Sequence, residues 1–356
     1  MWTRLLFAIR TFTADLGPRL GSWRLSIVLM VLAALYHGFL AVWANSSPPH
    51  VVQNIAGLIP FWLVYGLLLV NTGVCLWRRL PQLRRELARG DWPALGTFLF
   101  HGAFLLIAAG FLLTIAGRQE AKVWAAVGEE FTGDPSQYLS QSAPKPLAAG
   151  VPVTGFRVEE IRPEFWRDQL LFTTLEADLT LASGGKATTR INRPLWLGWS
   201  TFLRLSGFGY TPRYELQDRQ GGVLDSSFVK LNIFPPGQRD YFSPPEYPHR
   251  IYLEVFPDYE EVAGEPTSKS LNLANPATAV QIYRGRLALA QGVLRYGEAL
   301  SFEGLNLLFP EIRYWGEFTI VRDPGAPVLF LGFILGLIGL VLKVIGSLQG
   351  TRHDLG

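Results

Sequence analysis

Four long apolar runs limit what this chain can fold into. The run over residues 94–116 carries no charged side chain, and about 20 apolar residues are enough for a helix to cross a bilayer. Runs over residues 25–44, 58–77 and 327–346 are of similar length and are also predominantly apolar. The sequence therefore predicts four transmembrane helices, with one long polar segment between the third and the fourth.

The positions of the basic residues predict the sidedness of these helices. Arginines lie within residues 4–24, before the first run, and within residues 78–89, whereas residues 45–57 contain no lysine or arginine. The positive-inside rule places both termini and an arginine-rich linker, 78–91, in the cytoplasm and residues 117–324 outside. We expect a multi-pass protein in the lipid bilayer of the inner (cytoplasmic) membrane. Because the arginines flank membrane spans, a nucleic-acid partner is not expected.

The ends of the chain complete the predicted organisation. Residues 1–22 are basic and amphipathic and are expected to lie on the cytoplasmic surface of the membrane. Residues 23–116 then contain the first three helices, and residues 325–356 contain the fourth helix and a cytoplasmic tail.

Residues 117–324 predict an extracytoplasmic all-β domain. Runs rich in β-branched and aromatic residues alternate with turn signals such as Ser-Gly-Gly at 183–185, which favours an antiparallel sandwich or a barrel-like domain. A helix over residues 277–286 is the alternative for one of these runs. The only cysteine, Cys75, lies in the second span, so the domain can contain no internal disulfide. The predicted strands cover residues 153–161, 171–181, 201–205, 226–234, 250–256 and 279–283.

The histidines are the candidate ligands for a cofactor. The chain has five, and His37 and His101 lie inside predicted spans. An ionisable side chain in a span is costly and commonly functional, and imidazole nitrogens serve as axial ligands of haem iron. Since no Cys-x-x-Cys-His motif is present, the group to consider is haem b, with iron held by His101 or, secondarily, by His37. His50, just outside the first span, and His249, in an aromatic stretch, are secondary candidates for an outer haem site.

Each of the two span histidines also has a structural alternative. His101 can be a neutral packing residue bonded to a carbonyl or to Asn71, and Asn71 itself is expected to form an interhelical hydrogen bond. At 1.5 Å per residue, His101 lies about 10 Å and His37 roughly 18 Å from the inner ends of their spans. This offset does not suit a shared haem, so either a partner chain supplies a second ligand or only one histidine is a ligand.

The sequence shows no arrangement typical of an enzyme. It contains no recognisable nucleophile–base arrangement, phosphate-binding loop or metal-spaced acidic cluster. A complete active site within this chain is therefore not expected.

Local motifs spread over most of the chain point to a family. Together with the four-span layout, they resemble the ResB-like family, part of the system II machinery of cytochrome c biogenesis. The motifs are Leu-Gly-Ser-Trp-Arg-Leu-Ser at 20–26, Asn-Thr-Gly-Val-Cys-Leu-Trp-Arg at 71–78, Phe-His-Gly at 100–102, Asn-Arg-Pro-Leu-Trp-Leu-Gly-Trp at 192–199, Gly-Phe-Gly-Tyr at 207–210 and Arg-Asp-Pro-Gly at 322–325.

The resemblance implies a function. In that family this subunit works with a ResC-type multi-span partner in carrying haem outward, and the third-span histidine, His101 here, is implicated as an axial ligand. The expected role is therefore haem handling in c-type cytochrome maturation, with haem b shared with a ResC-like partner. Two alternatives stay open: a membrane subunit of an electron-transfer complex that contacts multihaem cytochromes, and a scaffold without a cofactor.

Overall fold

The chain divides into a helical unit and a β-rich unit. The computed structural model describes residues 19–44, 59–147, 150, 154–166, 172–232 and 238–353. The helical unit comprises residues 1–116 and 324–356, and the β-rich unit comprises residues 117–323. Most of the predicted amphipathic segment 1–22 lies outside the described residues.

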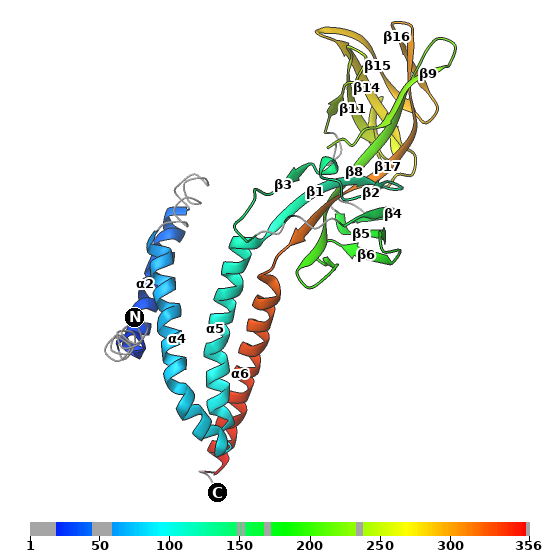
Figure 1. Ribbon diagram of the computed structural model, residues 1–356. Helices are drawn as coiled ribbons and strands as arrows, with labels where there is room; N and C mark the ends of the chain where they lie inside the picture. The colour runs from blue at the N-terminus through cyan, green and yellow to red at the C-terminus, as the bar shows by residue number, and fades with distance from the viewer. Residues whose placement is uncertain are drawn as a thin grey trace. The chain divides into compact units, whose positions relative to one another are not determined.

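Within its described residues, the helical unit contains four helices (Figure 1). They are α2 (Trp23–Ala44), α4 (Ile59–Ala88), α5 (Trp92–Gly117) and α6 (Ala326–His353). Three described helical segments are long and apolar enough to cross a membrane, namely Leu63–Ala88, Trp92–Gly117 and Ala326–Gly346, and a shorter apolar helix covers Trp23–Phe39.

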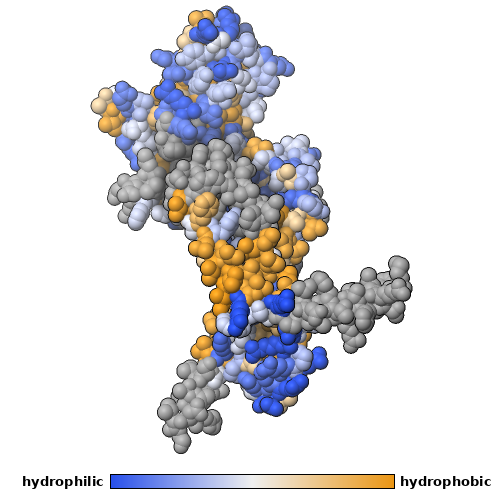
Figure 2. Space-filling view, turned by 90° about the vertical axis from the view of Figure 1, so that its left-hand side faces the viewer, coloured by the Kyte–Doolittle hydropathy of each residue, from blue (hydrophilic) through white to orange (hydrophobic). Residues whose placement is uncertain are grey.

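The helices expose apolar side chains instead of burying them. Phe39, Leu63 and Phe333 are each more than half exposed, and Figure 2 shows the apolar surface that such residues form over the helices. Continuous apolar surface of this kind marks contact with lipid or with another protein. The chain is therefore a membrane protein with a β-rich unit.

Helix α4 continues through the arginine-rich segment that was predicted as a linker. Residues 78–88 are helical, Leu83 is buried, and Gln82 Nε2 donates to Glu86 Oε1 at 2.7 Å one turn later. Leucine, arginine, glutamine and glutamate are good helix formers, and pairs four residues apart stabilise a helix. The prediction of a linker over 78–91 was therefore wrong for most of its length.

A short turn joins α4 to α5. Gly90 has a φ of 79°, a left-handed conformation that suits glycine at the end of a helix. Asp91 Oδ1 then accepts a hydrogen bond from Ala94 N at 3.1 Å and caps the start of α5.

Glycines let α5 and α6 pack closely. A Cβ atom at Gly339 would lie 2.5 Å from Phe100 N, and one at Gly332 would lie 2.8 Å from Ile107 Cγ1. Such distances leave no room for a larger residue. Small residues four apart on a helix allow this kind of close helix contact.

The described part of the β-rich unit contains four sheets and one 3₁₀ turn, η1 (Pro135–Gln137). The largest sheet is ordered β3-β1-β17-β8-β7, with β16 paired to β17 and β9 paired to β8. Its strands are β1 (Gln119–Ala126), β3 (Ser140–Gln141), β7 (Leu195–Trp196), β8 (Thr201–Gln217), β9 (Val223–Phe228), β16 (Ala299–Phe302) and β17 (Leu305–Arg322).

The other three sheets are smaller and antiparallel. One is ordered β2-β4-β5-β6, one β10-β11-β14-β15, and one pairs β12 with β13. Their strands are β2 (Glu130–Phe131), β4 (Phe156–Phe165), β5 (Phe172–Leu181), β6 (Lys186–Arg190), β10 (Asp240–Phe242), β11 (Arg250–Phe256), β12 (Tyr259–Val262), β13 (Glu265–Ser268), β14 (Ala277–Arg284) and β15 (Leu287–Arg295).

Two long strands, β8 and β17, connect two hydrophobic cores (Figure 1). Leu203 and Leu205, early in β8, are fully buried in a core with β4 and β5. Tyr214 and Leu216, late in β8, are buried in a second core with β11 and β14. Side chains two residues apart on a strand share a face, and a register shift in β8 between Leu205 and Gly207 separates the first of these pairs from the second.

The helix considered over residues 277–286 is wrong, because this segment is strand β14. Val280 and Ile282 are buried in the second core, two residues apart. β-Branched residues with this period favour a strand over a helix. The strand predicted over 250–256 is confirmed as β11, whereas the one predicted over 226–234 is wrong beyond residue 228, where β9 ends and residues 229–232 are not in a strand.

Candidate functional site

His101 lies on α5, one turn after Thr97. Its Nδ1 is 2.7 Å from Thr97 O, and because a carbonyl oxygen can only accept, Nδ1 carries the proton. The side chain is exposed, and Nε2 makes no hydrogen bond with any described residue. An imidazole fixed in this way presents Nε2 with its lone pair, as metal-ligating histidines do. The predicted alternative, a histidine bonded to a carbonyl, therefore describes Nδ1 of His101 but leaves Nε2 available.

A pocket of about 300 Å³ contains His101 in its lining. Its walls come from three helices: Trp23 and Ser26 from α2, Asn71, Thr72, Cys75, Leu76 and Arg79 from α4, and Thr97 and Phe98 from α5. This volume lies at the lower end of the roughly 300–1,000 Å³ usual for small-molecule sites. The pocket can hold part of a larger ligand.

The wall from α4 holds the start of α2 in place. Asn71 is fully buried, its Oδ1 accepts from Ser26 Oγ at 2.5 Å, and its Nδ2 donates to the carbonyls of Leu20 and Ser22. Cys75 Sγ donates to the Gly21 carbonyl at 3.1 Å. The interhelical role predicted for Asn71 is confirmed, and the motifs at 20–26 and 71–78 are brought together by these bonds.

Arg79 is the one charged residue among those that line the pocket. Its Nε is buried and lacks a hydrogen-bond partner among the described residues, while its Nη2 is 4.0 Å from Glu86 Oε2. From the sequence alone, Arg79 is one member of the basic segment that follows the second apolar run. Its spacing of four from Cys75 and eight from Asn71 places all three on one helix face, a signal that could have identified it.

His37 does not line this pocket. Its Nδ1 is 2.9 Å from Ala33 O, and Tyr65 Oη lies 3.1 Å from Nδ1 and 3.4 Å from Nε2. Tyr65 belongs to α4, so this contact links α2 to α4. The structure does not bring His37 and His101 into one site.

His249 lies in the β-rich unit and is buried there. Its Nε2 is 3.0 Å from Glu303 Oε2, and the other oxygen of Glu303 is 3.0 Å from Arg284 Nη2. Its ring meets Phe302 edge to face, and Nδ1 is buried without a partner among the described residues. Metal ligation through Nε2 would require the ion pair to separate. His50 lies outside the described residues.

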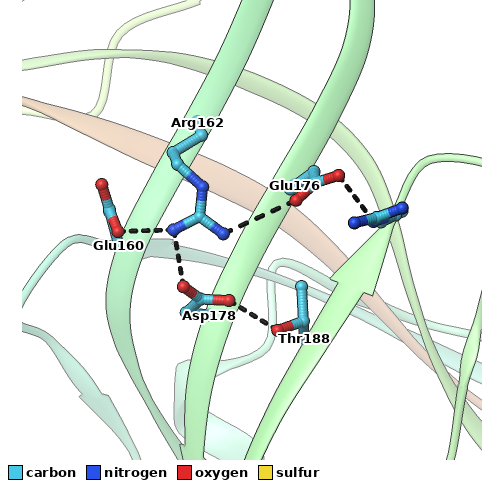
Figure 3. Close-up of polar contacts among 6 residues, drawn as sticks. Glu160, Arg162, Glu176, Asp178 and Thr188 are labelled. Atoms are coloured by element: carbon cyan, nitrogen blue, oxygen red, sulfur yellow. Dashed lines mark hydrogen bonds and ion pairs between the residues drawn. The ribbon is translucent and has the colours of Figure 1, made fainter.

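The surface of the β-rich unit carries a polar network centred on Arg162 (Figure 3). Its Nη1 contacts Glu160 and Asp178, both at 2.5 Å, and its Nη2 contacts Glu176 at 3.5 Å. Hydrogen bonds from Arg162 and then from Thr188 lower the pKa of Asp178. The Arg162 side chain is 38% exposed, so the network is a solvated surface feature. Within the described residues, no group of three or more His, Cys, Asp or Glu residues is placed to hold a metal ion.

Comparison with known proteins supports the motif-based interpretation. The ResB-like family profile matches residues 88–347. A protein from Gloeobacter violaceus named Cytochrome c biogenesis protein CcsB is 24% identical over 268 residues, which are 73% of this chain and 52% of that protein. The chain thus spans about half the length of this curated relative.

A solved structure named Cytochrome c Heme Lyase CcmF is also similar. The match covers 90% of this chain and 34% of that chain at 14% identity, with a TM-score of 0.28, which is too low to support an argument. The family assignment rests instead on the profile, which matches well over half of the chain. This protein therefore belongs to the ResB-like family.

Proposed function

We propose that this chain is the haem-handling membrane subunit of a c-type cytochrome maturation system and acts with a ResC-like multi-span partner. Family membership and the name of the curated relative, a cytochrome c biogenesis protein, support this role. The observation that carries the proposal is the geometry of His101, with Nδ1 tied to Thr97 O and Nε2 left without a partner in the described chain.

The proposed topology has four membrane spans. Helices α2, α4, α5 and α6 cross the membrane, both termini are cytoplasmic, and residues 117–324 are extracytoplasmic. The arginines within 78–89 and the absence of lysine and arginine from 45–57 support this arrangement. It places His101 in the cytoplasmic half of the bilayer.

The residues around His101 fit a haem b whose iron would be held by His101. When bound, haem would supply an iron with an open coordination position, which accepts an imidazole nitrogen. The hydrogen bond to Thr97 O holds the ring orientation and directs the proton to Nδ1. Since His37 lies outside the pocket, any further residue that would hold the iron would belong to the partner chain.

Purification of the full chain from its native membrane, without crosslinking, tests this function. The proposal predicts a co-purified Trp-rich multi-span protein and a low-spin b-type absorbance spectrum. Multihaem cytochromes as the stable partners would favour an electron-transfer subunit instead. A complex without any haem absorbance after reconstitution with haem would favour a scaffold and would contradict the proposal.

A further inference from the structure

We propose that Arg79 binds a carboxylate of the ligand held by His101, which for haem is a propionate. This inference rests on the proposed function and deepens it, because it names the part of the ligand that a second residue of this chain recognises. Arg79 is on α4 and His101 is on α5, and both line the same pocket of about 300 Å³.

This assignment follows from which side chains of the pocket lining already have hydrogen-bond partners and which do not. Both threonines of the lining already have acceptors: Thr72 Oγ1 donates to Leu68 O at 2.8 Å, and Thr97 Oγ1 donates to Pro93 O at 3.0 Å. Ser26 donates to Asn71, and Asn71 and Cys75 donate to carbonyls just before α2. By contrast, Arg79 Nε is buried without a partner and His101 Nε2 makes no hydrogen bond among the described residues.

These two nitrogen atoms bind different kinds of ligand group. Arg79 Nε is a donor, and a guanidinium binds a carboxylate through two parallel hydrogen bonds. His101 Nε2 is an acceptor or a metal ligand. A ligand that satisfies both carries a carboxylate together with a hydrogen-bond donor or a metal ion, and an iron porphyrin, with its propionates and its iron, meets both requirements.

The Arg79 guanidinium also favours an anion at this pocket. No carboxylate is among the residues that line it, and Glu86 Oε2 lies 4.0 Å from Arg79 Nη2. This distance is too long for a hydrogen bond, and Glu86 Oε2 is itself buried without a hydrogen-bond partner among the described residues, so Glu86 does not satisfy Arg79 Nε. The Arg79 side chain is 42% exposed, so it is accessible to a ligand carboxylate, with which it would form charge-assisted hydrogen bonds.

The test compares haem with its dimethyl ester, in which both propionates are blocked. The full chain with its co-purified partner is placed in phosphatidylcholine nanodiscs, stripped of haem and titrated with each compound. Wild type is expected to bind haem more tightly than the ester. Arg79→Gln is expected to weaken binding of haem by about tenfold, the size of one hydrogen bond to a charged group, and to leave binding of the ester unchanged.

Two controls separate charge from folding. Arg84→Gln changes an exposed arginine of the same helix outside the pocket, and is expected to bind both compounds as wild type does. Arg79→Lys retains a charge without the planar fork and is expected to fall between wild type and Arg79→Gln. At saturation, Arg79→Gln keeps the low-spin spectrum, because His101 is intact.

The outcomes distinguish the two proposals. If wild type binds neither compound, or if His101→Ala leaves the spectrum unchanged, the proposed function fails and the Arg79 assignment fails with it. If wild type binds both compounds equally and Arg79→Gln binds haem normally, Arg79 does not hold a propionate, while the proposal for His101 stands. Loss of bound phosphatidylglycerol from Arg79→Gln in mixed nanodiscs, with normal haem binding, would overturn the assignment in favour of a lipid phosphate.

Discussion

His101 differs from His37 and His249 in the state of its Nε2. In His37 both ring nitrogens lie within 3.4 Å of Tyr65 Oη, and in His249 the Nε2 atom meets Glu303 at 3.0 Å. His101 uses only Nδ1, within its own helix. An imidazole in a membrane span without an acidic partner needs some compensation for its contact with hydrocarbon, and under the proposed function iron ligation would provide it.

Asn71→Ala tests the residue-scale account of the pocket wall. The substitution removes the hydrogen bonds to Ser26, Leu20 and Ser22, and it is expected to lower the free energy of unfolding by about 1–2 kcal/mol. Thermal unfolding in detergent, followed by tryptophan fluorescence, measures this loss. Thr72→Ala, which removes a hydrogen bond within α4 only, is the matched control. Equal effects of the two variants would show that the Asn71 hydrogen bonds do not stabilise the contact between α4 and α2.

At the scale of elements, the sequence predicted what depends on local pattern. The strand over 250–256 and the four apolar helices were found because alternation and length are local properties. The helical arginine segment was missed because its charge suggested a solvated linker, although one of its side chains, Leu83, is buried. The pocket was missed because three helices form it, and their convergence is a tertiary property with no signal in any one segment.

Gly339→Val tests the packing of α5 against α6. A Cβ at this position would lie 2.5 Å from Phe100 N, so the helices would have to separate, at a cost of about 1–3 kcal/mol. The expected result is a lower midpoint of thermal unfolding in detergent. Gly66→Val is the matched control, since a Cβ there meets nothing within 4 Å. A variant as stable as that control would contradict close packing.

The Arg162 network predicts a dependence of stability on pH. Because the pKa of Asp178 is lower in the folded chain than its usual value of about 3.9, this carboxylate stabilises the fold above that pH, and the contribution is lost as pH falls through the lowered pKa. In Arg162→Leu, the free energy of unfolding should fall less steeply below about pH 4 than in wild type. At pH 7 the substitution should lower it by no more than about 1 kcal/mol, since the network is solvated.

Urea unfolding of the full chain between pH 3 and pH 7 measures that effect. Arg157→Leu is the control, because Arg157 is 54% exposed and meets Glu159 at 3.9 Å. If Arg162→Leu and Arg157→Leu show the same acid dependence, the depressed pKa of Asp178 does not contribute to stability.

At the scale of the whole molecule, the chain combines a membrane unit with a β-rich unit in which β8 and β17 connect two of the hydrophobic cores. The membrane unit carries the histidine and arginine that the proposed function uses, and the β-rich unit has no internal disulfide because Cys75 lies in α4. Four apolar runs and one polar segment predicted this division from the sequence. The pairing of β8 with β17 joins residues about 100 positions apart, which local pattern does not reveal.

Reporter fusions test the sidedness of the whole chain. A reporter placed at Asp91, in the turn before α5, should be cytoplasmic, and one placed at Gly184, in the turn between β5 and β6, should be extracytoplasmic. Alkaline phosphatase and green fluorescent protein fusions at both positions give opposite readings under this topology. The same sidedness at both positions would rule it out.

The most direct test of haem ligation is the absorbance of the assembled complex carrying His101→Ala or His101→Gln. If His101 is the axial ligand, the low-spin b-type signal is lost from the folded complex and is partly restored by added imidazole. His37→Gln, outside the pocket, is expected to keep the signal. An unchanged spectrum in a correctly assembled His101 variant would show that this residue does not hold haem.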